Sequence, residues 1–169
     1  MSGEGLPQLD VDGTGLTVAI VSGLWHHEIA GGLLGGARRV LHASGATVTE
    51  VQVAGSFELP LACKAALEAG ADAVVALGVI VRGETPHFDY VAAAATDGLT
   101  RVALDTGKPV GFGVLTVDDE RQGLDRAGLP DSKEDVGGRA AEAAIATAST
   151  LRRIAAGLPV VGPDEAGID

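Results

Sequence analysis

Four short apolar runs, each followed by a stretch with helical spacing, limit most strongly how this chain can fold. The runs are rich in β-branched residues and span residues 16–22, 47–53, 72–81 and 109–116. The third run, DAVVALGVIV, is apolar throughout, whereas a half-exposed strand would alternate. The pattern therefore predicts an α/β fold with a four-stranded, mostly parallel sheet covered by helices on both faces.

The stretches between and after the strands repeat their apolar residues with the period of an α-helix. Two such sets each predict a helix with one buried face: Ile29, Leu33, Leu34, Ala37, Val40 and Leu41 after the first strand, and Ala140, Ala141, Ala144, Ile145, Ala148, Leu151 and Ala155 near the end. A chain of 169 residues fits one domain, which we place at 14–157 between tails at 1–13 and 158–169. LPQLDVDG (6–13) could form a lone strand that pairs with the sheet edge of a neighbouring subunit.

Charge and composition exclude several classes of protein. Twelve Lys and Arg against 23 Asp and Glu, a net charge of -11, argue against a nucleic-acid partner. The longest apolar run, Ala73–Val81, is too short to span a membrane, and the first residues lack a signal-peptide pattern, so we expect a cytoplasmic protein. Cys63 is interpreted as a small buried hydrophobe, and the adjacent His26 and His27 lack metal-ligand spacing, so no metal site is predicted.

Most of the few aromatic residues follow a predicted strand. Trp25, Phe57 and Phe88 come after the first, second and third runs, and Phe112 lies in the fourth. Open parallel sheets bind ligands outside the carboxyl ends of their strands, so this placement favours a flat ring as ligand. The alternative is that each aromatic side chain caps the core from its loop.

The segment RGETPHFDY (82–90) carries the clearest signal for chemistry. Thr85 and Pro86 fit the N-cap and first turn of a helix, whose free N–H groups, with Gly83 allowing close backbone approach, suit a phosphate. His87 in that first turn is placed for proton transfer near neutral pH, although a surface histidine with no chemical role is the alternative.

Two familiar sequence signatures, the phosphate-binding loop and the serine-hydrolase elbow, are incomplete in this chain. GVIVRGET (78–85) has phosphate-loop spacing, but Glu84 stands where lysine is required. Ser56 is not in a Gly-x-Ser-x-Gly elbow, which argues against a serine hydrolase, and is interpreted as a helix N-cap.

From about Leu16 to Leu151 the chain resembles lumazine synthases. The resemblance rests on VAIVSGLWHHEI, GSFELP, ALGVIVRGETPHFDYV and GFGVLTVDDERQGLDRAG, in that order. It implies a flavodoxin-like three-layer fold and a cofactor-free transferase of riboflavin biosynthesis. This enzyme condenses 5-amino-6-(D-ribitylamino)uracil with 3,4-dihydroxy-2-butanone 4-phosphate to give 6,7-dimethyl-8-ribityllumazine, phosphate and water. The resemblance further implies a homopentamer or an icosahedral shell of pentamers, active sites between adjacent subunits, and riboflavin synthase as a candidate partner.

The same resemblance assigns roles to individual residues. Trp25 and the neighbouring subunit's Phe112 would sandwich the pyrimidinedione ring, and His87 would shuttle protons. Further ring and ribityl contacts would come from His26, Ser56, Phe57, Glu58, Ile80 and Val81. The phosphate would be held by Arg82, Gly83, Glu84 and Thr85 and by the neighbour's Arg126, with Lys133 as a further candidate.

One position departs from the family pattern. Val136 stands where close relatives carry a lysine. Lys133 either reaches the same phosphate or is a solvated surface lysine, and the sequence does not decide between them. Two alternatives therefore stay open: a specialised paralogue that condenses a different amine or carbonyl, and a non-catalytic flavin or lumazine binder or shell protein.

Overall fold

The computed structural model describes residues 9–159, and within them strands and helices alternate. The strands are β1 (Thr17–Gly23), β2 (Thr47–Val53), β3 (Ala73–Val81) and β4 (Val110–Val117), and the helices are α1 (His27–Ala43), α2 (Leu59–Glu68), α3 (His87–Thr106), α4 (Glu120–Leu124) and α5 (Val136–Ala155), with a 3-10 turn η1 at Ser56–Glu58. Each strand starts within one residue of its predicted position, so the apolar runs located the sheet correctly.

The sheet of the described residues has the order β2-β1-β3-β4, and all its strands are parallel. The prediction of a mostly parallel sheet is confirmed. The chain moves outward from β1 to β2 and then crosses back, so that β3 pairs with the other side of β1. In open α/β sheets, such a reversal leaves a crevice at the carboxyl ends of the two central strands.

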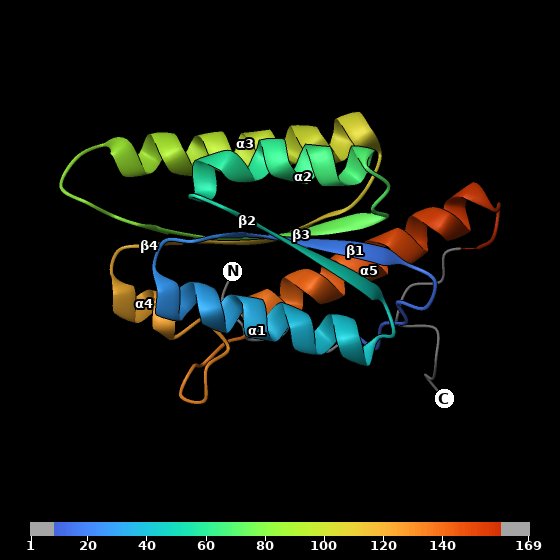
Figure 1. Cartoon of the computed structure of the whole chain (residues 1–169), viewed down its shortest axis with the longest axis horizontal. Helices are drawn as coiled ribbons and strands as arrows, with labels where there is room; N and C mark the ends of the chain where they lie inside the picture. Colours follow the sequence, from blue (N-terminus) through green and yellow to red (C-terminus); the bar gives the residue numbers. More distant parts are fainter. Residues whose placement is uncertain (1–8, 160–169) are drawn as a thin grey trace, which may run out of the picture.

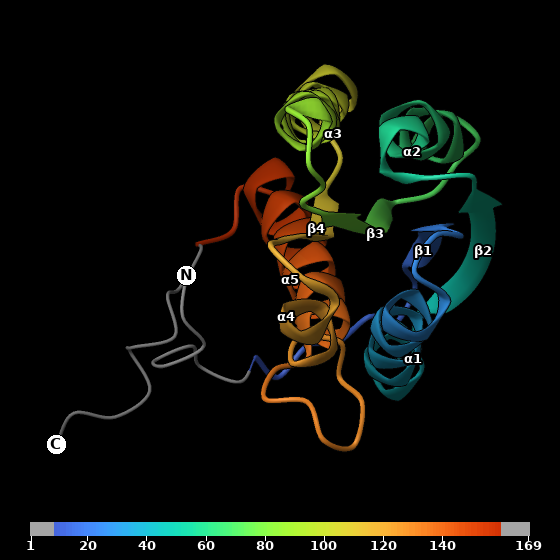
Figure 2. The same ribbon diagram turned by 90° about the vertical axis from the view of Figure 1, so that its left-hand side faces the viewer.

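Helices cover the sheet on both faces and give the three layers expected (Figures 1 and 2). Residues alternate across each strand, so Val18 and Ile20 of β1 face α1 and α5, while Ala19 and Val21 face α2 and α3. Two separate apolar cores result, one on each face. Cys63 of α2 is fully buried in the second core, as predicted.

Glycines let α1 and α5 pack at close range beneath the sheet. A Cβ atom at Gly137 would overlap the Leu33 carbonyl oxygen, and one at Gly32 would come within 2.5 Å of the Ala127 carbonyl oxygen. Because the clashing atoms are backbone, they cannot rotate away. The contact holds the start of α5 against the middle of α1 and so fixes the loop before α5.

Two local predictions were wrong. Thr85 is not an N-cap: α3 begins at His87 with Pro86 in the N-cap position, and no side chain caps it. Ser56 is the first residue of η1 rather than its cap, which is Gly55. In both places the N-cap residue lies one position away from the residue whose side chain could have capped the helix.

The predicted strand at 6–13 is only partly covered by the structure. Residues 9–13 have no strand structure, and residues 6–8 lie outside the described residues. Among residues 9–159, no helix is long and apolar enough to cross a membrane.

Candidate active site

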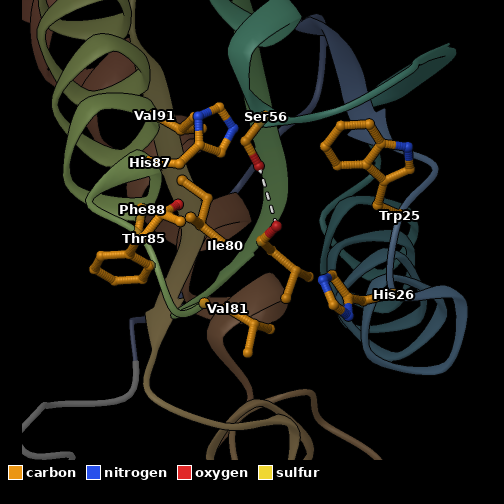
Figure 3. Close-up of a pocket in the computed structure, with 11 residues that line it drawn as sticks. Trp25, His26, Ser56, Ile80, Val81, Thr85, His87, Phe88 and Val91 are labelled. Atoms are coloured by element: carbon orange, nitrogen blue, oxygen red, sulfur yellow. Dashed lines mark hydrogen bonds between the residues drawn. The ribbon is translucent and has the colours of Figure 1, made fainter.

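A hollow of about 210 Å³ opens at the carboxyl ends of β1 and β3 (Figure 3). It lies at the point where the strand order reverses, as expected for this class of sheet. We call it the first hollow, and its lining consists of Trp25, His26, Ser56, Val79, Ile80, Val81, Gly83, Thr85, His87, Phe88 and Val91. The prediction from sequence thus named most of the residues that the fold brings together here.

Trp25 follows β1, and its indole ring rests on the backbone of the neighbouring loop. A Cβ atom at Gly55 would come within 3.1 Å of the ring, so the glycine lets the indole lie close to the backbone. The side chain is nevertheless 62% exposed. A large aromatic surface, supported on one side, is therefore available for stacking.

His26, beside Trp25, has an unusual backbone. Its φ of 56° lies in the left-handed region, and among residues 9–159 no other non-glycine residue has a positive φ. Its Nδ1 atom lies 3.3 Å from Oε1 of Glu120, which begins α4. Strain of this kind persists only where the surrounding contacts enforce it, and it occurs often at functional sites.

The loop after β2 is tied to β3 by buried contacts. The hydroxyl of Ser56, which is buried, donates to the Val79 carbonyl oxygen at 3.4 Å (Figure 3). Oε2 of Glu58 accepts a hydrogen bond from the Gly55 N–H at 3.0 Å. Glu58 therefore shapes the loop that supports Trp25. Neither Glu58 nor the exposed Phe57 lines the first hollow.

His87 is the first residue of α3, and its side chain is exposed to the first hollow. Figure 3 shows its imidazole on the Ser56 side of the hollow, with Trp25 and His26 across from it. An imidazole in this position can exchange protons with a ligand that stacks on Trp25.

In the segment before α3, some residues line the first hollow and others contact side chains of the same chain. Gly83 and Thr85 line the first hollow, and a Cβ atom at Gly83 would meet nothing within 4 Å. Arg82 lies 4.1 Å above the Phe88 ring and donates from Nε to Oδ1 of Asp118 at 3.0 Å. The bond to Asp118 raises the pKa of Arg82. Neither Arg82 nor Glu84 lines this hollow.

A second, wider hollow of about 610 Å³ lies beside β4 and the start of α5. We call it the second hollow, and its lining includes Phe112, Thr116, Arg126, Glu134, Val136, Arg139 and Glu142. Phe112 and Arg126, which the resemblance places in the neighbouring subunit's half of the site, therefore share this hollow and are absent from the lining of the first.

Lys133 lines neither of these hollows. Its Nζ atom lies 2.8 Å from Oδ2 of Asp125, and this bond lowers the pKa of the Asp125 carboxyl group. Lys133 is bound on the surface of its own chain. This geometry matches the alternative of a surface lysine, and a phosphate contact by Lys133 stays a prediction.

A family model described as 6,7-dimethyl-8-ribityllumazine synthase matches residues 15–152 of the chain. The chain belongs to the lumazine synthase family. A 6,7-dimethyl-8-ribityllumazine synthase from Leifsonia xyli subsp. xyli is 70% identical over 91% of this chain and 99% of its own. The protein of the same name from Clavibacter sepedonicus is 66% identical over 91% of this chain and 98% of its own. A third, from Streptomyces coelicolor, is 53% identical over 91% and 97%.

The sequence did not reveal every residue that shapes the two hollows of this lumazine synthase family member. Gly55 beneath Trp25 and the carbonyl of Val79 give no side-chain signal. Arg139 and Glu134 could have been found, because Arg139 follows Val136 by three residues and so shares its helix face.

Proposed function

We propose that this chain catalyses the lumazine synthase reaction of riboflavin biosynthesis. It joins 5-amino-6-(D-ribitylamino)uracil to 3,4-dihydroxy-2-butanone 4-phosphate. The observation that carries the proposal is the first hollow, where an exposed indole, a buried serine and the histidine that begins α3 meet at the switch point of the sheet. The family match over residues 15–152 supports the same activity.

In this proposal the uracil ring stacks on Trp25. The backbone of Ile80 and Val81, at the end of β3, offers polar groups to the ring edge, and Ser56 and His26 border the same space. The N-terminus of α3, which no side chain caps, receives the substrate phosphate together with Gly83 and Thr85, because a helix N-terminus favours anions.

The chemistry requires little beyond position and proton transfer. The 5-amino group attacks the ketone carbon, and loss of water gives an imine. Loss of inorganic phosphate and closure of the second ring, with release of another water, yield the lumazine. His87 accepts and returns the protons of these steps. Holding the two reactants together supplies much of the remaining rate enhancement.

We further propose that the enzyme is a cytoplasmic homopentamer with sites shared between subunits. The first hollow has no Arg or Lys in its lining among the described residues, although one substrate carries a phosphate. The second hollow supplies Arg126 together with Phe112. If the second hollow of one subunit faces the first hollow of the next, the ring lies between Trp25 and Phe112, and the phosphate lies between the α3 start and Arg126. The exposed edge strand β2 then offers a place for a neighbour's N-terminal strand.

Turnover tests the proposed activity. Purified protein is mixed with both substrates, and the lumazine absorbance and the released phosphate are followed together. We expect one phosphate per lumazine formed. Intact substrates after prolonged incubation would contradict the proposal, and a bound yellow ligand in such inactive protein would favour the non-catalytic binder.

A further inference from the structure

Two arginines in the second hollow share one carboxylate. Oε1 of Glu134 lies 3.8 Å from Nε of Arg126, and Oε2 contacts Nη2 of Arg139. Arg126 also donates from Nη1 to the Gln122 carbonyl oxygen at 2.9 Å. These contacts use two nitrogens of Arg126 and one of Arg139. Both guanidinium groups therefore keep further N–H donors, as each has five in all.

The charges in this hollow balance only because Arg139 is present. In the described residues that line it, Arg126 and Arg139 face the carboxylates of Glu134 and Glu142. Burial raises the pKa of Glu142, with Asp135 adding to the rise and Arg139 opposing it. Without Arg139, the lining with both glutamates ionised would carry an excess negative charge, which would repel a phosphate.

The position of Arg139 on α5 carries its guanidinium toward the start of the helix. Side chains on a helix lean toward its N-terminus, so residue 139 covers the surface one turn earlier, where Val136 lies. The contact with Glu134, which precedes the helix, shows that Arg139 does reach back this far. Val136 offers no charge there, and Lys133 is held by Asp125.

We propose that Arg139 is a second phosphate-binding cation, acting beside Arg126, and that Glu134 is a positioning residue that keeps the two guanidinium groups adjacent. The inference rests on the proposed function, since the phosphate belongs to the butanone substrate. An arginine pair gives several charged N–H donors, which suits a phosphate group better than a single cation does.

Steady-state kinetics with each substrate varied in turn tests the inference. Arg139→Gln should raise the KM for the butanone phosphate about tenfold, the effect of losing a hydrogen bond to a charged group. The KM for the ribitylaminouracil should stay unchanged. Val136→Lys in the Arg139→Gln background should recover most of the loss, because Val136 lines the same hollow and a lysine there would restore a positive charge.

Binding of inorganic phosphate, measured by calorimetry, separates this inference from the proposed function. Arg139→Gln should weaken phosphate binding and Arg139→Lys should retain most of it, whether or not the wild type turns over. Arg152→Gln is the matched control, since it removes the same charge from the far end of α5, where Arg152 pairs with Asp72. Active wild type with unchanged KM and phosphate affinity in Arg139→Gln would overturn the inference and leave the function intact. Equal rises in both KM values, without recovery by Val136→Lys, would also overturn it and indicate a structural ion pair.

Discussion

Several side chains beside the first hollow are engaged within their own chain. Glu58 holds the Gly55 N–H, and Arg82 is shared between Phe88 and Asp118. The resemblance to lumazine synthases predicted both as ligand-binding. It could not show that internal partners compete for them, since those partners lie in other segments of the chain. Trp25 and His87, by contrast, present exposed side chains to the hollow.

His87 should be the residue whose loss most reduces the rate. We expect His87→Gln to lower kcat about 100-fold, because an amide can hydrogen-bond but cannot exchange protons near neutral pH. His42→Gln, at the exposed end of α1, should leave kcat unchanged. Stopped-flow measurement of lumazine formation under saturating substrates checks both. Equal rates in the two variants would remove His87 from the mechanism.

Cys63 should make the stability depend on alkaline pH. Burial raises the pKa of its thiol to about 12, whereas the unfolded chain ionises near the ordinary value. From about pH 9 to pH 12 the folded state keeps a proton that the unfolded state loses. The free energy of unfolding should therefore fall with rising pH, by up to about 1.4 kcal/mol per unit.

Cys63→Ala isolates this effect from other titrating groups. The variant should be less stable at neutral pH because it leaves a cavity, but its stability should fall less steeply above pH 9. Denaturant unfolding at several pH values gives the slope of the unfolding free energy against pH for wild type and for the variant. Parallel slopes for the two proteins would show that the thiol does not ionise differently on unfolding.

At the scale of secondary structure, the sequence predicted the sheet better than the helix ends. A buried parallel strand needs a continuous apolar run, which is visible in one dimension. A helix start depends on which of several adjacent residues adopts the terminal conformation, and this decided against Thr85 and Ser56 as caps. Boundaries of this kind follow from tertiary contacts that the local pattern does not contain.

Packing of α1 against α5 gives a test at the same scale. Gly137→Ala should destabilise the protein by about 1–3 kcal/mol, because the added methyl group meets the Leu33 backbone. Gly31→Ala has nothing within 4 Å and lies on the exposed side of α1. It should stabilise the helix by about 0.5–1 kcal/mol.

Both glycine variants should be compared with wild type at one protein concentration, because association contributes to apparent stability. Chemical denaturation then gives the change in the free energy of unfolding for each variant. If Gly137→Ala were as stable as wild type, α1 and α5 could move apart without loss of stability, and the close contact would not matter.

At the scale of the whole molecule, ten of the predicted site residues divide between two hollows, and five line neither: Phe57, Glu58, Arg82, Glu84 and Lys133. The first hollow gathers Trp25, His26, Ser56, Ile80, Val81, Gly83, Thr85 and His87, whereas Phe112 and Arg126 lie in the second. Spacing along the chain could not separate the two groups, because most of these residues lie in or soon after strands of one sheet. The division was implied only by resemblance to the family, and the structure of one chain shows both surfaces without joining them.

Mixed assembly of two inactive variants tests the central claim, a condensing site shared between subunits. His87→Ala and Arg126→Ala subunits are expressed separately and together, and lumazine formation is measured for each preparation. Each variant alone has no intact site, but in an equal random mixture about a quarter of the sites combine His87 of one subunit with Arg126 of the next. We predict that the mixed particles recover about that fraction of wild-type activity. Activity no higher than that of the separate variants would contradict the shared site.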